Sequence, residues 1–127
     1  MRRYVLSVIL LLLGLKYGID FLLSEDFQKY GDKKKAQWTC HVNNFLGGIY
    51  EISSEYRQSV GLYDRVLNRC PDTPMAERAM FFKAYCLENL NQPREAMDAY
   101  IQYRDTFPNG QRINKVTTAI DRIRFSK

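Results

Sequence analysis

The chain has 127 residues, a length that allows one domain of ordinary size. Its net charge is +5, but both signs are interspersed: residues 1–35 hold seven basic and four acidic residues, and residues 36–127 hold twelve and ten. No basic stripe interleaved with aromatic side chains runs through the sequence, so its composition excludes nucleic-acid binding of that kind.

The chain opens with an apolar segment, Tyr4 to Leu23, which follows Arg2 and Arg3. About twenty residues is the length that an α-helix needs to cross the hydrocarbon core of a bilayer. We therefore predict a transmembrane signal anchor over residues 1–24, followed by a charged connector over residues 25–35. A cleaved signal peptide and a buried soluble helix are the alternatives. The anchor is favoured because no good small-x-small cleavage site follows the apolar run.

Two charged residues, Lys16 and Asp20, interrupt the second half of this segment. Their spacing of four places them on one helix face, where they can partly neutralise each other inside the membrane. Arg2 and Arg3 favour a cytoplasmic N-terminus, whereas the lysines of the connector argue against translocation. A short tail led by two arginines resembles the start of an exported bacterial protein. We therefore predict a single pass through the inner (cytoplasmic) membrane, with the C-terminal domain in the periplasm.

Residues 36–110 contain two stretches that share a pattern. The first reads Leu46-Gly47-Gly48-Ile49-Tyr50, and a small residue, an aromatic residue and a proline follow at Ser59, Tyr63 and Pro71. This stretch resembles the tetratricopeptide repeat, whose pattern is W-x2-L-G-x2-Y, then A-x3-F, then P. It departs from that pattern in having Asn43 at the tryptophan position and Ser59 at the alanine position.

The second stretch matches the same family mainly in its second half. Its residues at the corresponding positions are Met80, Ala84, Leu87, Ala96, Tyr100 and Pro108. Pro108 follows Pro71 by 37 residues, whereas the family period is about 34. The additional residues fall in a proline-rich joint at 71–75. This joint, followed by Ala76 and Ala79, resembles bacterial envelope members of the family, which include components of outer-membrane assembly.

The last stretch, residues 111–127, has apolar residues on one side only. They recur at three- and four-residue spacing at Ile113, Val116, Ile120 and Ile123. The predicted fold is therefore all-α: an N-terminal transmembrane helix, a short α-solenoid of two tetratricopeptide-like hairpins, and a C-terminal capping helix. Two repeats are few for a solenoid. We therefore expect a partner protein, a second copy of the chain or the membrane-proximal helix to cover the first hairpin.

The cysteines are Cys40, Cys70 and Cys86. In an antiparallel hairpin the start of the first helix lies beside the end of the second, which brings Cys40 and Cys70 within disulfide reach. An oxidising compartment would favour this bridge. The alternative is three unpaired cysteines packed as small hydrophobic residues.

Residues that carry chemistry are few. The single histidine, His41, stands beside Cys40 without the second ligand pair that a zinc site needs. The sequence has no glycine-rich phosphate loop and no G-x-S-x-G elbow. We predict no catalytic residues, no metal site, no cofactor and no small-molecule substrate, and we do not expect an enzyme.

These features predict a membrane-anchored scaffold or adapter that binds a protein partner in a cell-envelope assembly. The resemblance implies a concave face built by the first helix of each hairpin. On that face we expect the protein-binding contacts to be Asn43, Asn44, Tyr50, Phe82 and Tyr85.

Two other interpretations stay open. The chain could be an accessory structural subunit of a larger membrane complex, with the transmembrane helix as an interface and with Lys16 and Asp20 paired to a partner's helix. It could also be a cytosol-facing organellar import or adapter module, because the two flanks of the anchor give opposing topology signals.

Overall fold

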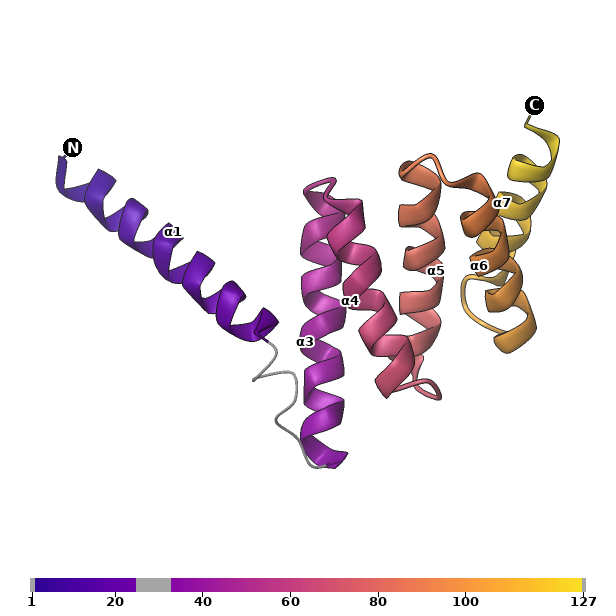
Figure 1. Cartoon of the computed structure of the whole chain (residues 1–127), viewed down its shortest axis with the longest axis horizontal. Coiled ribbons are helices and arrows are strands. Elements are labelled where there is room, and N and C mark those ends of the chain that lie inside the picture. Colours follow the sequence, from indigo (N-terminus) through magenta and orange to yellow (C-terminus); the bar gives the residue numbers. More distant parts are fainter. Residues whose placement is uncertain (1, 25–32, 127) are drawn as a thin grey trace. The chain divides into compact units, whose positions relative to one another are not determined.

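The computed structural model of the chain describes residues 2–24 and 33–126, and it describes the side chains of 4–24 and 37–126. This part of the chain is all-α, with six helices that follow one another along the sequence (Figure 1). Their bounds are α1 (Arg2–Leu23), α3 (Lys33–Ile52), α4 (Tyr56–Arg69), α5 (Pro74–Asn89), α6 (Pro93–Thr106) and α7 (Ile113–Phe125). The chain divides into two compact units, residues 1–35 and 36–127.

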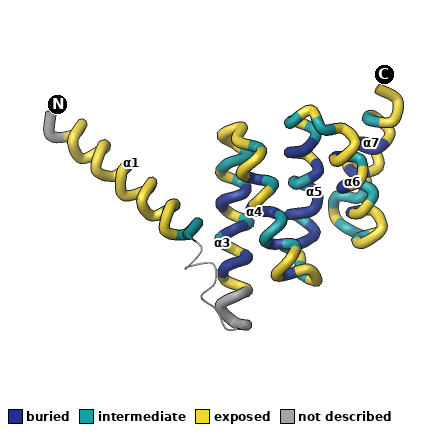
Figure 2. Tube along the Cα trace, in the orientation of Figure 1, coloured by how far each residue is buried: buried dark blue, intermediate teal, exposed yellow. Residues whose placement is uncertain are grey.

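In the first unit, α1 contains a span, Tyr4–Leu23, that is long and apolar enough to cross a membrane. None of this span is buried (Figure 2). An exposed apolar helix at this position is a candidate signal anchor or signal sequence. Residues 25–32, which make up most of the predicted connector, lie outside the described residues. α3 begins at Lys33, inside the segment predicted as connector.

In the second unit, α3 and α4 form one antiparallel hairpin, and α5 and α6 form another. The turns of the two hairpins match at an offset of 37 residues, because Ser54 and Asn91 both have left-handed backbone, with φ of 61° and 57°. Each of these residues donates its N–H to the carbonyl three residues earlier, that of Glu51 or Glu88. The backbone therefore repeats in the same register as the sequence pattern.

A side-chain hydrogen bond recurs at the same offset. The Tyr63 hydroxyl donates to the Glu51 carboxylate at 2.9 Å, and the Tyr100 hydroxyl donates to the Glu88 carboxylate at 3.0 Å. Each bond joins the second helix of a hairpin to the first. It satisfies the polar end of a tyrosine whose ring is buried in the core.

Small residues let the helices of each hairpin approach closely. A Cβ atom at Gly47 would lie 2.7 Å from Tyr63 Cε1, and the Ser59 hydroxyl donates to the Gly47 carbonyl at 2.9 Å. The corresponding residues of the second hairpin, Ala84 and Ala96, are completely buried. Backbone proximity in both hairpins thus depends on residues with little or no side chain.

Packing between consecutive helices places the core along the middle of the second unit (Figure 2). Tyr63 stacks on Phe82, with ring centroids 6.3 Å apart, and so joins α4 to α5. The final helix, α7, packs its buried residues Val116, Ala119 and Ile120 against the same core. Its opposite side is exposed, as the one-sided apolar pattern predicts.

Candidate protein-binding face

A hollow of about 510 Å³ lies between α3 and α5. α3 supplies most of its lining and α5 supplies one arginine. The lining residues are His41, Asn44, Phe45, Gly48, Ile49, Ile52 and Arg78.

α3 is apolar on two faces. One face, which includes the buried Cys40 and Leu46, packs inside the hairpin. The other face is a stripe that we call the α3 seam. It consists of Trp38, Val42, Phe45, Ile49 and Ile52. Within it, Phe45 is 68% exposed and Ile52 is 85% exposed, so the other helices of the second unit leave much of this apolar stripe uncovered.

Arg78 borders the seam from α5. Its Nη1 donates to the Asn44 Oδ1 at 3.1 Å, and its guanidinium lies 4.5 Å from the centroid of the Phe82 ring. Both contacts hold the guanidinium in place without neutralising its charge. Among the described residues, no carboxylate forms an ion pair with Arg78.

The next helix pair, α5 and α7, is joined by ion pairs. The Glu77 carboxylate binds the Arg112 guanidinium at 2.6 Å and accepts a hydrogen bond from the Tyr103 hydroxyl. The backbone N–H of Arg112 donates to the same hydroxyl at 3.0 Å. Burial and the hydrogen bond to Glu77 raise the pKa of Tyr103 to about 12. This buried cluster fixes the start of α7 against α5 and α6.

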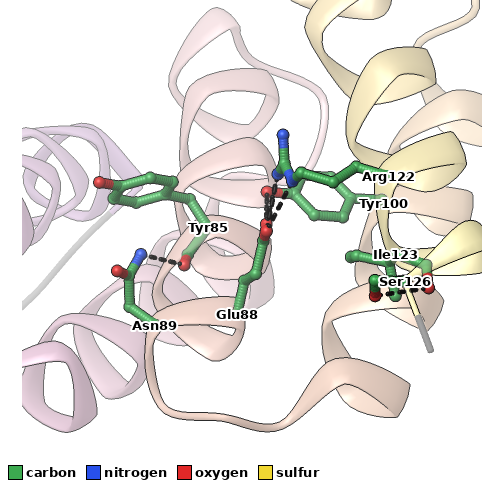
Figure 3. Close-up of polar contacts among 7 residues, drawn as sticks. All are labelled: Tyr85, Glu88, Asn89, Tyr100, Arg122, Ile123 and Ser126. Carbon is green, nitrogen blue, oxygen red and sulfur yellow. Dashed lines mark hydrogen bonds and ion pairs between the residues drawn. The ribbon is translucent and has the colours of Figure 1, made fainter.

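A second hollow, between α5 and α7, has Tyr85 and Arg122 among its lining residues. In Figure 3 the Tyr100 hydroxyl and the Arg122 guanidinium converge on the Glu88 carboxylate. The Arg122 Nη2 lies 2.7 Å from Glu88 Oε1, so this cation is neutralised within the chain. The Asn89 side chain, also in Figure 3, donates to the carbonyl of Tyr85.

The five residues predicted to bind a partner occupy different environments. Asn44 lines the first hollow, and Tyr85 lines the second with 38% of its surface exposed. Asn43 is completely buried, which removes its side chain from the surface. Tyr50 is half-buried, and Phe82 is partly buried and packs against the core beside Tyr63, Phe81 and Tyr85. Only Asn44 and Tyr85 of this set line either hollow.

The residues missing from that set are those of the seam and Arg78. Sequence patterning could have found the seam, since its members alternate at four- and three-residue spacing outside the positions of the repeat pattern. No spacing pattern in the sequence marks Arg78 as part of this face. Its relation to Asn44, 34 residues earlier, depends on how α5 packs against α3.

Cys40 and Cys70 form a disulfide, with Cα atoms 6.6 Å apart. The bond joins the first half of α3 to the residue that follows α4, as expected for the two open ends of an antiparallel hairpin. Cys86 is a free cysteine in α5 and is completely buried. Burial raises the pKa of the Cys86 thiol to about 12, which suppresses the thiolate and its reactivity.

The polar residues predicted inside the membrane, Lys16 and Asp20, lie on the exposed surface of α1. They stand four residues apart, but no ion pair joins them in the described helix.

Among the described residues, no group of three His, Cys, Asp or Glu side chains gathers as a metal site requires. The described surface of the second unit includes the two open hollows above and an exposed apolar stripe on α3. Comparisons of the chain with models of protein families, with curated proteins and with solved structures found no match.

Proposed function

We propose that this protein is a membrane-anchored scaffold of the tetratricopeptide type that binds a protein partner in a cell-envelope assembly. In this proposal α1 is the anchor, the two hairpins form a short solenoid, and α7 caps it. Support comes from the turns and the Tyr–Glu hydrogen bonds that recur 37 residues apart, because repeat proteins stack equivalent hairpins.

The observation that carries the proposal is the exposed α3 seam. A helix with apolar residues on two faces is normally covered on both, and soluble monomers seldom expose large apolar patches. The described helices of the second unit cover only one of these faces. A partner protein would remove the other face from water.

The same proposal places the chain in the inner membrane as a single-pass protein with its second unit in the periplasm. The disulfide between Cys40 and Cys70 supports this location, because such bonds persist outside the reducing cytoplasm. The exposed apolar helix α1 supports the anchor.

The test is co-purification of partners with the tagged full-length protein in mild detergent, identified by mass spectrometry. We compare the wild type with a variant carrying Phe45→Ser and Ile52→Ser. The matched control is Phe125→Ser, which removes an aromatic side chain that is 79% exposed on α7. We expect the seam variant to lose its partner by at least about tenfold, since interface anchors contribute 2 kcal/mol or more. Equal recovery by all three proteins would contradict the proposal.

A second candidate function is that of an accessory subunit that assembles through α1. The absence of an ion pair between Lys16 and Asp20 within the described helix favours it. Each such charge costs about 2.5–3.5 kcal/mol in hydrocarbon, and a partner's helix can offset that cost. Under this function Lys16→Leu or Asp20→Leu releases the partner. Under the scaffold function a chain that begins at Ala36 still recovers it.

A further inference from the structure

The spacing of the α3 seam indicates the shape of what covers it. Its residues, Trp38, Val42, Phe45, Ile49 and Ile52, alternate at intervals of four and three. This is the a/d spacing of a helix that packs along its length against another helix. At 1.5 Å per residue the seam runs for about 21 Å. It therefore fits a helix of about four turns better than an extended segment.

One flank of the seam carries a cation, Arg78, that forms no ion pair with a carboxylate of the described residues. Arg78 is half-buried, donates to the neutral Asn44 amide and stacks on Phe82. The two arginines that join α5 to α7 differ in this respect. Arg112 pairs with Glu77 at 2.6 Å, and Arg122 pairs with Glu88 at 2.7 Å.

Of the two carboxylates in these ion pairs, Glu88 corresponds to Glu51 in the first hairpin, whereas Glu77 has no acidic counterpart there. The residue that corresponds to Glu77, 37 positions earlier, is Cys40, which is held in the disulfide. Asn44 and Arg78 are 34 residues apart, as Glu88 and Arg122 are. Arg122 donates to the carboxylate of Glu88, whereas Arg78 donates to the amide of Asn44.

Glu51, the single acidic residue of α3, does not neutralise Arg78. It accepts a hydrogen bond from Tyr63 and forms no ion pair with Arg78. A half-buried guanidinium whose contacts are all neutral can bind a carboxylate from another protein. The resulting charge-assisted hydrogen bond is favourable because the guanidinium is already oriented.

We propose that an amphipathic helix of a partner protein docks on the α3 seam and places an Asp or Glu side chain against Arg78. The inference rests on the proposed function and specifies the chemistry of the partner. Charge complementarity favours another protein over a second copy of this chain. The flank of α3 toward Arg78 offers His41, Asn44 and Gly48, so a second α3 brings no carboxylate from these positions.

The test uses the full-length protein in nanodiscs and three fluorescent peptide helices. Each peptide has leucines at alternating three- and four-residue spacing, and the flanking positions are all Glu, all Gln or all Lys. We expect the Glu peptide to bind about tenfold more tightly than the Gln peptide, and the Lys peptide to bind most weakly. Equal binding of the three peptides, or no binding of any of them, overturns the inference.

Arg78→Gln should abolish the preference for Glu over Gln, and Arg57→Gln, on the exposed start of α4, should leave it unchanged. A second pair of variants avoids any effect on folding, because Ile52 is almost fully exposed. Ile52→Lys and Ile52→Glu remove the same apolar side chain, so their difference reports charge alone. We expect the Glu peptide to bind Ile52→Lys more tightly than Ile52→Glu, and equal binding or the opposite order overturns the inference.

The two proposals fail in distinguishable ways. If Phe45→Ser with Ile52→Ser releases a cellular partner but the peptides show no preference for Glu, the scaffold function stands and the acidic helix is wrong. If the full-length protein forms a dimer that Ile52→Lys dissociates, a second copy covers the seam and the inference is overturned. If the seam variants keep every partner, both proposals fail.

Discussion

Gly47 is a residue at which α3 and α4 approach closely in the first hairpin. An added Cβ atom would meet the Tyr63 ring at 2.7 Å, and Tyr63 is itself fixed by its hydrogen bond to Glu51. We expect Gly47→Ala to lower the free energy of unfolding by about 1–3 kcal/mol through overpacking. Urea unfolding followed by circular dichroism measures it.

The matched control for this substitution is Gly61→Ala. Gly61 lies on the exposed side of α4, where a Cβ atom meets nothing within 4 Å. Alanine there should raise the stability by about 0.5–1 kcal/mol, because it favours the helix. If both substitutions changed the stability by the same amount and in the same direction, close packing at Gly47 would not be the cause.

We expect the protein to lose stability at alkaline pH, because the Tyr103 hydroxyl and the Cys86 thiol are buried. The pKa of Tyr103 rises from 10.0 to about 12, and that of Cys86 rises from 9.0 to about 12, chiefly because both groups are buried. In both cases the folded state holds the proton more tightly than the unfolded state. The stabilisation is therefore complete below pH 9 and declines as the pH rises from 9 toward about 12.

Urea titrations at increasing pH test this decline. In the Cys86→Ala variant the loss should begin about one pH unit later, because the tyrosines, with an ordinary pKa of 10.0, then titrate first. A stability that stays constant up to about pH 11 would show that these groups are not buried in the folded protein.

At the scale of the element, a disulfide ties α3 to the end of α4. The bond between Cys40 and Cys70 closes a separation of 30 residues. We expect the Cys40→Ala/Cys70→Ala variant to lose about 3 kcal/mol of stability. Amide hydrogen exchange should accelerate in α3 and α4 and remain slow in α6 and α7. Reductant should lower the stability of the wild type and leave this variant unchanged.

At the scale of the whole molecule, the compartment of the second unit determines whether the disulfide forms. We expect alkylation of intact bacterial cells, without reductant, to leave Cys40 and Cys70 unmodified in the full-length protein. Cys86 should react only after denaturation, because it is buried. The matched control is a chain that begins at Ala36, which lacks α1 and remains in the reducing cytoplasm. Alkylation of Cys40 and Cys70 in both proteins would contradict an extracytoplasmic second unit.

The helices were largely predictable from local sequence. Apolar periodicity and the placement of prolines indicate all-α structure, and α5 and α6 begin at Pro74 and Pro93, where proline is favoured. The candidate binding face was less predictable. The repeat pattern identifies positions along a helix but does not say how deeply each side chain is buried. Asn43 and Phe82 were therefore expected on the surface, although Asn43 is buried and Phe82 packs against the core.

The sequence by itself determined that the chain is helical, that it begins with an apolar helix, and that two hairpins with small residues at their crossings follow. These properties depend on composition or on contacts between residues a few positions apart, and both can be read from the order of residues in the chain. Only the tertiary structure decided that Glu77 neutralises Arg112 whereas Arg78 has only the Asn44 amide. Charge pairing between helices depends on distances between residues more than thirty positions apart, and packing sets those distances.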